Sequence, residues 1–223
     1  LDFHYSDTWA DPTKQEIPLA WEINLNNDSL LGDMLYSYTF STLKTLDSLE
    51  LSPEIVQLGN EINPMILQKG NLQWPIDWDR NSLLLNKGIE AVRNFSVETQ
   101  NNIEIMLHIA QPENGIWWFD QASSNNVVDY DWIGLSYYPQ WSQYKLSNLE
   151  PVLTNLRTTY NKKLMIVETA YPFTLQNNDS ANNILDSQGL LVDYPATQQG
   201  QLDYLLELKQ VLQNSGGSGL VYW

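Results

Sequence analysis

Short apolar segments alternate with longer segments of helical spacing along this chain, and this alternation constrains its fold more than any other feature. The apolar segments are bounded by turn-forming residues. They are apolar at successive positions, which is typical of strands buried on both faces of a parallel sheet. We predict six strands, namely one that ends within Leu1–Tyr5 and others at Ile55–Leu58, Ile103–Ile109, Trp132–Tyr138, Leu164–Val167 and Leu220–Trp223.

The segments between these strands carry apolar residues at the spacing of amphipathic helices. The predicted buried stripes are Leu35, Tyr38, Thr42, Leu46 and Leu49; Leu84, Gly88, Ala91, Val92 and Phe95; Val152, Leu153, Leu156 and Tyr160; and Leu202, Leu205, Leu206 and Leu212. Strand–helix alternation predicts an α/β fold with helices covering a parallel sheet. No linker or repeat divides residues 1–223, so we expect a single domain. A dinucleotide-binding fold is disfavoured because no glycine-rich phosphate loop follows the first strand.

The charge of the chain limits its partners. It carries 27 acidic and 11 basic residues, a formal net charge of −16. Such a chain could not neutralise a nucleic-acid backbone or bind an anionic membrane surface, which leaves a neutral polymer as the natural partner. No apolar run is long enough to insert into a bilayer, and no signal peptide is visible. The absence of cysteine excludes a disulfide or a cysteine nucleophile.

Polar and aromatic residues follow or end each predicted strand. They are His4 and Asp7, then Asn60 and Glu61, then His108, then Tyr137 and Tyr138, then Glu168, and finally Trp223. In a (β/α) barrel the C-terminal ends of the strands form the rim on which active sites are built. We therefore predict that these side chains converge on one site.

Two of these residues, Glu61 and Glu168, are acids that directly follow apolar strands. Buried acids are costly unless they are paired or used, and few basic residues are available here to pair with them. Two carboxylates about 5–5.5 Å apart can cleave a glycosidic bond with retention, one as acid and one as nucleophile. Spacing alone leaves the assignment of the two roles open.

The chain holds nine tryptophans, and several stand beside proline, glycine or aspartate in predicted loops. Flat aromatic faces suit the C–H faces of sugar rings, although each could instead pack a loop. The six candidates are Trp9, Trp74, Trp78, Trp117, Trp118 and Trp141.

Several motifs together resemble glycoside hydrolase family 53, the endo-β-1,4-galactanases of clan A. The motifs are Leu1–Pro12, Gln57–Glu61, Asp131–Pro139, Val167–Tyr171, Gly200-Gln201 and Val221–Trp223. The resemblance implies a TIM (β/α)8 barrel that hydrolyses β-1,4-galactan, or type I arabinogalactan, internally and by double displacement. Glu61 would be the acid/base and Glu168 the nucleophile.

The same resemblance implies roles for the other residues at the strand ends. Asn60 would bind the sugar 2-hydroxyl, Tyr138 or Tyr137 would orient the nucleophile, and Trp223 would floor the subsite of the cleaved galactose. His4, Asp7, Trp9 and His108 would line the cleft, where each histidine could equally be a hydrogen-bonded scaffold residue. No catalytic cofactor is implied. A structural calcium ion could bind Asn177, Asp179 and Asn183, whose oxygen ligands alternate in the loop after the nucleophile strand.

Counted by the family, the chain would begin in the third strand and hold about six of eight strands. An N-terminally truncated barrel has open sheet edges, so we expect little or no activity from this chain alone. The family further implies an extracellular or periplasmic location and a monomer when the protein is full length. Two other readings remain open: another clan A activity, such as a β-mannanase or xylanase, and a catalytically impaired carbohydrate-binding barrel.

Overall fold

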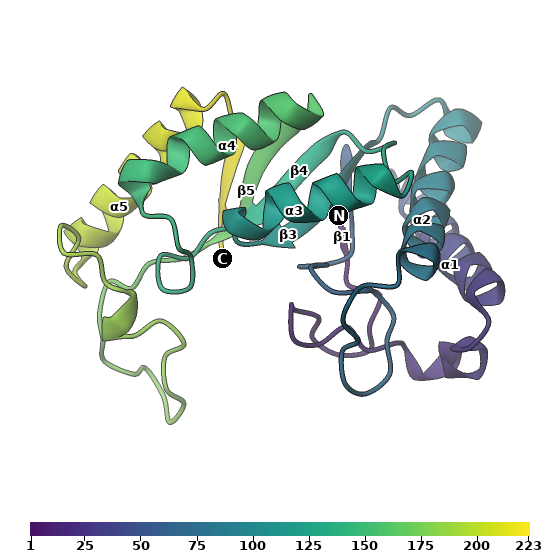
Figure 1. Cartoon of the computed structure of the whole chain (residues 1–223), viewed down its shortest axis with the longest axis horizontal. Coiled ribbons are helices and arrows are strands. Elements are labelled where there is room, and N and C mark those ends of the chain that lie inside the picture. The colour runs from purple at the N-terminus through teal and green to yellow at the C-terminus, as the bar shows by residue number, and fades with distance from the viewer. The chain divides into compact units, whose positions relative to one another are not determined.

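Six strands alternate with helices in the computed structural model, which describes residues 1–223 (Figure 1). The elements are β1 (Asp2–Phe3), η1 (Leu19–Asn24), α1 (Asp28–Ser48), β2 (Ile55–Leu58), α2 (Trp78–Thr99), β3 (Glu104–Ala110), α3 (Pro112–Ser124), β4 (Trp132–Ser136), α4 (Leu146–Tyr160), β5 (Lys163–Thr169), η2 (Ser187–Gly189), α5 (Gln198–Asn214) and β6 (Gly219–Tyr222). The strands follow the order β1-β2-β3-β4-β5-β6 in the sheet. The predicted strands are confirmed to within two residues at each end.

The chain divides into two compact units. One consists of Leu1–Ile109 with Trp117–Ile133, and the other of Ala110–Ile116 with Gly134–Trp223. The prediction of a single domain over residues 1–223 stays a prediction.

In the first unit, β1 pairs in parallel with β2 and β2 in parallel with β3. Helices α1 and α2 lie side by side (Figure 1). The predicted buried stripe of α2 is correct at all five positions. Within it, Gly88 permits close packing, because a Cβ there would lie 3.1 Å from the Leu35 side chain of α1.

The predicted stripe of α1 is wrong except at Leu35. The helix buries Leu31, Gly32, Leu35, Thr39 and Leu43 instead. Thr39 is polar by residue type, but its hydroxyl donates to the Leu35 carbonyl at 2.8 Å and pairs with the Tyr5 hydroxyl at 2.7 Å. These bonds satisfy a polar group that a hydrophobic pattern places outside the core. Tyr38 stays half exposed, with its ring against Trp21.

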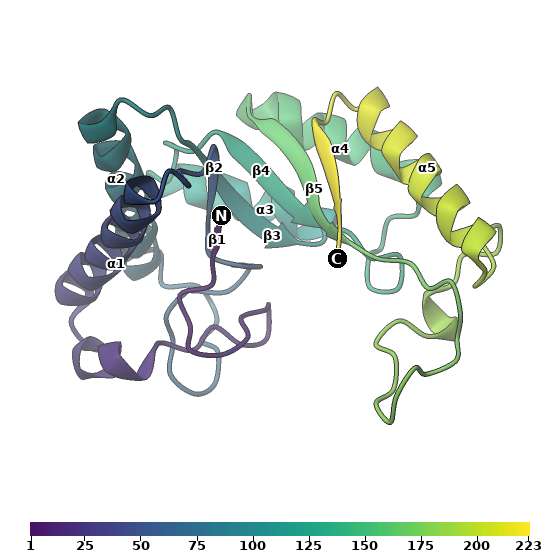
Figure 2. The same cartoon turned by 180° about the vertical axis from the view of Figure 1, so that it is seen from behind.

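In the second unit, β5 and β6 are parallel neighbours and α5 packs beside β6 (Figure 2). The predicted stripe of α4 is buried at Leu153 and Leu156. The stripe of α5 is wrong except at Leu212, since Leu202 and Leu206 are exposed. The buried face of α5 holds Gly200, Tyr204, Leu208, Val211 and Leu212.

Tyr204 explains why the pattern misplaced the buried face of α5. Its ring stacks on Tyr171 with centroids 4.3 Å apart, and its hydroxyl lies 3.1 Å from Thr169 Oγ1. An aromatic residue with a satisfied hydroxyl therefore occupies the face that the leucine spacing assigned elsewhere.

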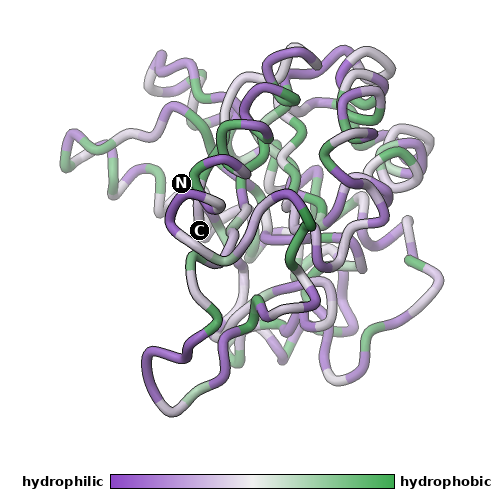
Figure 3. Tube along the Cα trace, turned by 90° about the vertical axis from the view of Figure 1, so that its left-hand side faces the viewer, coloured by the Kyte–Doolittle hydropathy of each residue, from purple (hydrophilic) through white to green (hydrophobic).

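Helix α3 was not predicted, because its first turn holds proline and glycine and its tryptophans were interpreted as loop residues. Trp117 and Trp118 both lie in this helix, and Trp118 is fully buried. Trp118 is therefore a core residue and not a sugar-binding one. Figure 3 shows hydrophilic and hydrophobic residues mixed along the helices, and no helix is both long and apolar enough to cross a membrane.

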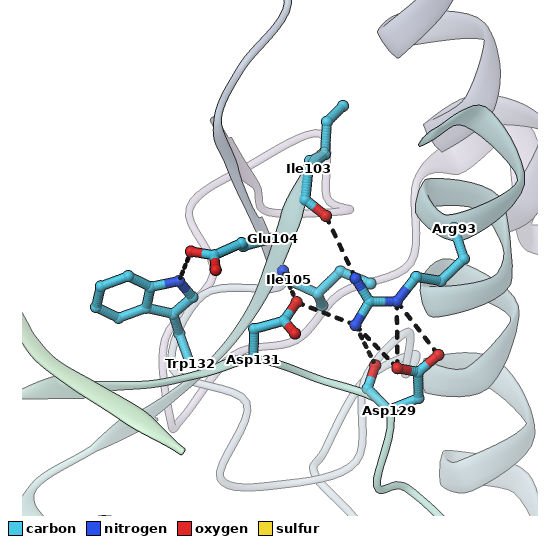
Figure 4. Close-up of polar contacts among 7 residues, drawn as sticks. All are labelled: Arg93, Ile103, Glu104, Ile105, Asp129, Asp131 and Trp132. Carbon is cyan, nitrogen blue, oxygen red and sulfur yellow. Dashed lines mark hydrogen bonds and ion pairs between the residues drawn. The ribbon is translucent and has the colours of Figure 1, made fainter. Parts of the chain in front are cut away.

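The starts of β3 and β4 are joined by a network around Arg93 of α2 (Figure 4). Its guanidinium contacts both carboxylate oxygens of Asp129 and lies 3.0 Å from the Asp131 carboxylate. It also donates to the Ile103 carbonyl at 3.3 Å. Asp131 in turn accepts the Ile105 N–H at 2.7 Å. The Arg93 side chain therefore connects α2 to the starts of β3 and β4.

Replacing Arg93 with glutamine should lower the stability of the protein without changing its chemistry. The carboxylates are partly exposed, so we expect a loss of about 1 kcal/mol and a fall in Tm of about 2–4 °C. The control is Lys44→Gln, which breaks one exposed ion pair with Glu98 and should shift Tm by less than about 1 °C. Thermal melting followed by circular dichroism would measure both, and equal shifts would contradict the network.

Candidate active site

Glu61 is presented by a sharp turn directly after β2. Gly59 has φ 85° and Glu61 has φ 47°, both in the left-handed region. A Cβ on Gly59 would lie 2.4 Å from the Ile62 side chain, so this position needs glycine. The left-handed conformation costs a glutamate about 1 kcal/mol or more. Strain of this kind persists only where the surrounding structure enforces it, and it clusters at functional sites.

Neighbouring segments enforce this turn through hydrogen bonds. The Gly59 N–H donates to the Phe3 carbonyl and the Ile62 N–H to the His108 carbonyl, at 2.8 and 2.9 Å. The buried Gln15 amide donates to the carbonyls of Asn60 and Glu61. Gln15 was missed by the sequence analysis, because a single glutamine in a loop carries no periodic or motif signal.

Asn60 and His108 form the buried layer beneath Glu61. Asn60 donates from Nδ2 to the Ala10 carbonyl at 2.8 Å, and its Oδ1 lies 3.0 Å from His108 Nδ1. The same nitrogen accepts the Glu61 N–H at 3.3 Å and lies 3.2 Å from Gln57 Nε2. Gln57 was also missed, although a polar residue inside an apolar strand could have marked it.

His108 is only 1% exposed. Burial, with a smaller contribution from the charge of His4, lowers the pKa of His108 to about 3. The ring is therefore neutral at ordinary pH and cannot act as an imidazolium acid. Its bond from the Glu61 N–H is that of a scaffold histidine that fixes the backbone of Glu61.

The residues after β1 lie in an exposed segment. The His4 ring packs edge-on to Trp9 with centroids 5.8 Å apart, and His4 Nε2 lies 3.1 Å from the Asp2 carboxylate. Asp7 accepts the Leu19 N–H at 2.8 Å, which anchors the start of η1. The structure thus brings His4 and Trp9 together, whereas Asp7 serves the neighbouring loop.

Glu168 stands near the end of β5 in the second unit, and its carboxylate is held by a tyrosine. The Tyr138 hydroxyl donates to Glu168 Oε1 at 2.6 Å. The sequence left both Tyr137 and Tyr138 open for this contact. The buried Tyr137 instead donates its hydroxyl to the Tyr144 carbonyl and its N–H to the Glu168 carbonyl. A short bond from a phenol fixes the orientation of the carboxylate.

The loop after β4 supports Tyr138 in turn. The Trp141 ring meets the Tyr138 ring edge-on at 5.0 Å, and the N–H groups of Trp141 and Ser142 donate to the Tyr138 carbonyl. Glu113 accepts bonds from the Ser142 hydroxyl and the Gln143 N–H at 2.9 and 2.8 Å. Glu113 was missed, since only the folded loop brings it to these residues.

Trp223 follows β6 and is exposed, and its N–H donates to the Thr169 carbonyl at 2.9 Å. Trp223 directly follows Tyr222, which pairs with Thr169, the residue after Glu168 on the neighbouring strand. Trp223 and Glu168 therefore stand at the same ends of two paired strands.

The loop of Asn177, Asp179 and Asn183 is exposed and internally hydrogen bonded. Asn177 Oδ1 accepts the Asn183 N–H at 3.1 Å, and Asp179 Oδ1 accepts the Ala181 N–H at 2.8 Å. Asn183 Nδ2 donates to the Gln176 carbonyl at 3.2 Å. All three side chains offer oxygen ligands for a metal ion, but only Asp179 is a carboxylate.

Similarity in sequence and similarity in structure point to the same protein family. The sequence profile of glycosyl hydrolase family 53 matches residues 1–223. An arabinogalactan endo-beta-1,4-galactanase of Cellvibrio japonicus (strain Ueda107) is 52% identical over 225 residues, covering 100% of this chain and 60% of that protein. An endo-beta-1,4-galactanase of Bacillus subtilis (strain 168) is 38% identical, covering 100% of this chain and 50% of that protein.

The solved GH53 catalytic domain of Ignisphaera aggregans matches with a TM-score of 0.86 and 32% identity, covering 100% of this chain and 61% of that one. The chain thus spans about 60% of the length of several relatives that it matches. This likeness and the six strands of the sheet confirm the predicted fold, a TIM barrel represented by about six of its eight strands. Because the profile covers every residue, the chain belongs to glycosyl hydrolase family 53.

Proposed function

We propose that the protein hydrolyses internal β-1,4-galactosidic bonds of galactan and type I arabinogalactan with retention of configuration. The observation that carries this proposal is the 52% identity, over the whole chain, to an arabinogalactan endo-beta-1,4-galactanase. An acidic protein with a formal charge of −16 also suits a neutral polysaccharide better than a polyanion.

In the proposed mechanism, Glu168 attacks the anomeric carbon and forms a covalent galactosyl-enzyme, while Glu61 gives its proton to the leaving glycosidic oxygen. Glu61 then takes a proton from water, whose oxygen displaces Glu168 and restores the original configuration. The Tyr138 hydroxyl orients Glu168 through its 2.6 Å bond. The family resemblance, together with the enforced turn at Glu61 and the tyrosine clamp on Glu168, supports this assignment.

Asn60 would bind the sugar 2-hydroxyl. An asparagine amide has two N–H donors, and the bond to the Ala10 carbonyl uses only one of them. The second can serve the substrate, while the bond to the Ala10 carbonyl fixes the amide. Trp223, His4 and Trp9 would supply aromatic and polar surface for neighbouring sugars, with His108 as support.

A polysaccharide panel tests the proposal. The purified protein, expressed at full length with any sequence that flanks residues 1–223, is incubated with galactan, mannan and xylan, and the products are separated by chromatography. Galacto-oligosaccharides from galactan alone are expected, and proton NMR should show the β-anomer first. Cleavage of mannan or xylan would favour another clan A activity, and galactan binding without turnover would favour an impaired carbohydrate-binding barrel.

No cofactor takes part in the proposed mechanism, and calcium binding by Asn177, Asp179 and Asn183 stays a prediction. Asn177 Oδ1 and Asp179 Oδ1 already accept backbone N–H groups. An ion would share these oxygens, so we expect affinity no tighter than about 10⁻⁴–10⁻³ M. Thermal melting with millimolar calcium should raise Tm slightly in the parent and not in Asp179→Asn. Equal shifts in both proteins would contradict this site.

We further propose that the protein acts outside the cytoplasm and, when full length, as a monomer. A polymeric substrate is too large to enter a cell intact, so its internal bonds must be cut extracellularly or in the periplasm. Size-exclusion chromatography with light scattering would measure the oligomeric state, and a dimer mass would overturn the second point.

A further inference from the structure

Two exposed tryptophans lie against each other in the first unit. Trp74 is 55% exposed and Trp117 is 45% exposed, and their ring centroids lie 6.1 Å apart with planes tilted by 38°. Behind them, Trp78 packs against the buried Trp118 with centroids 5.5 Å apart. The outer pair thus presents adjoining indole surface to solvent, while the inner pair packs into the core.

The loop that carries Trp74 is held in place by buried polar side chains. The Arg80 guanidinium donates to the carbonyls of Ile66 and Leu67 at 2.8 and 2.5 Å. The Asn81 side chain accepts the Ile66 N–H at 3.1 Å, and the Gln68 side chain accepts the Gln73 N–H at 2.8 Å. All three side chains belong to buried residues. These bonds fix the loop up to Gln73, the residue before Trp74. The exposed position of Trp74 therefore follows from the fold of this loop.

Both tryptophans lie in segments that follow β2 and β3, and Glu61 follows the end of β2. Trp74 lies on the connection from β2 to α2, and Trp117 lies in α3, which follows β3. Strands β2 and β3 are parallel neighbours, so both connections leave from the same strand ends as the turn at Glu61. In a (β/α) barrel these connections form the substrate-binding face.

We propose that Trp74 and Trp117 form a stacking platform for galactosyl units of the polymer that lie away from the bond being cleaved. This inference rests on the proposed function. In a β-galactose ring the C–H groups at positions 3, 4 and 5 share one face, and an indole offers a matching apolar surface. Two adjoining indoles tilted by 38° suit successive rings of a bending chain better than one flat sugar.

Substrates of different length distinguish the role of the platform from that of the catalytic residues. Trp74→Ala, Trp117→Ala and the double variant should each raise KM on long galactan, by about threefold to tenfold per tryptophan, with little change in kcat. On an aryl β-1,4-galactobioside, too short to reach the platform, kcat/KM should stay within about twofold of the parent. Trp74→Phe and Trp117→Phe, which keep an aromatic face, should restore much of the affinity.

A binding measurement gives a second readout. In a Glu168→Gln background, affinity gel electrophoresis in galactan should show retardation that is reduced when both tryptophans are replaced. Val97→Ala is the control, since Val97 is an exposed apolar residue near the end of α2. The protein with both Glu168→Gln and Val97→Ala should be retarded as much as the Glu168→Gln protein. Melting temperatures identify any alanine variant that misfolds. If alanine is not tolerated at one of the two tryptophans, the alanine and phenylalanine variants at the other tryptophan test the platform.

The outcomes distinguish the platform from the function on which it rests. A full-length parent protein, with any sequence that flanks residues 1–223, that cleaves no galactan overturns the proposed function. An active parent whose tryptophan variants keep the same ratio of long-substrate to short-substrate kcat/KM overturns the platform alone. Unchanged retardation of the double variant in galactan gels does the same.

Discussion

Replacing Glu168 with glutamine is expected to lower kcat on galactan by about four to five orders of magnitude. The amide cannot attack the anomeric carbon, so no galactosyl-enzyme forms. It keeps the size of the carboxylate and an oxygen that can accept the Tyr138 hydroxyl, which donates at 2.6 Å in the parent. The loss should therefore appear in kcat, while galactan binding in affinity gels is preserved.

The matched control is Glu98→Gln, which neutralises an exposed acid on α2 that pairs with Lys44. It should retain the activity of the parent. For Glu168→Ala, added azide can occupy the space of the lost carboxylate and attack an activated aryl galactobioside from the same side. The product would then be the α-glycosyl azide, with inverted configuration. Substantial turnover of galactan by Glu168→Gln would remove Glu168 as the nucleophile.

The strands and the positions of Glu61 and Glu168 at strand ends could be predicted from sequence because their signals are local. An apolar run such as Ile55–Leu58 identifies its strand, and an acid just beyond it marks the strand end. The buried faces of α1 and α5 could not be predicted in this way. Thr39 and Tyr204 are buried because distant hydroxyl partners satisfy them, and no spacing rule records those partners.

The same limit applies to the supports of the site. The choice of Tyr138 over Tyr137 as the partner of Glu168 depends on which hydroxyl the folded loop aims at the carboxylate. Gln15 and Glu113 act from loops that come close only on folding. Trp118 and Trp117 are adjacent in sequence, yet one is buried and the other exposed, because successive residues of α3 point in different directions.

Replacing Glu61 with alanine should have an effect that depends on the leaving group. Galactan has a sugar alcohol as leaving group, which departs only when protonated, so kcat should fall by about three orders of magnitude or more. A dinitrophenyl galactobioside has a leaving group that needs no proton. Its first step should stay fast while hydrolysis of the galactosyl-enzyme becomes slow, which gives a burst of dinitrophenol.

Azide again reports the role of the residue, with the opposite stereochemistry. In Glu61→Ala the nucleophile is intact, so azide attacks the galactosyl-enzyme in place of water and yields the β-glycosyl azide. The pH–rate profile on galactan should also lose its descending alkaline limb, because that limb reports loss of the acid's proton. A conservative Glu61→Gln variant separates chemistry from folding, since backbone contacts of Glu61 with His108 and Gln15 enforce the turn and are kept in the variant. If Glu61→Ala gave the α-azide, or lost the dinitrophenyl substrate as fully as galactan, the roles of the two acids would have to be exchanged.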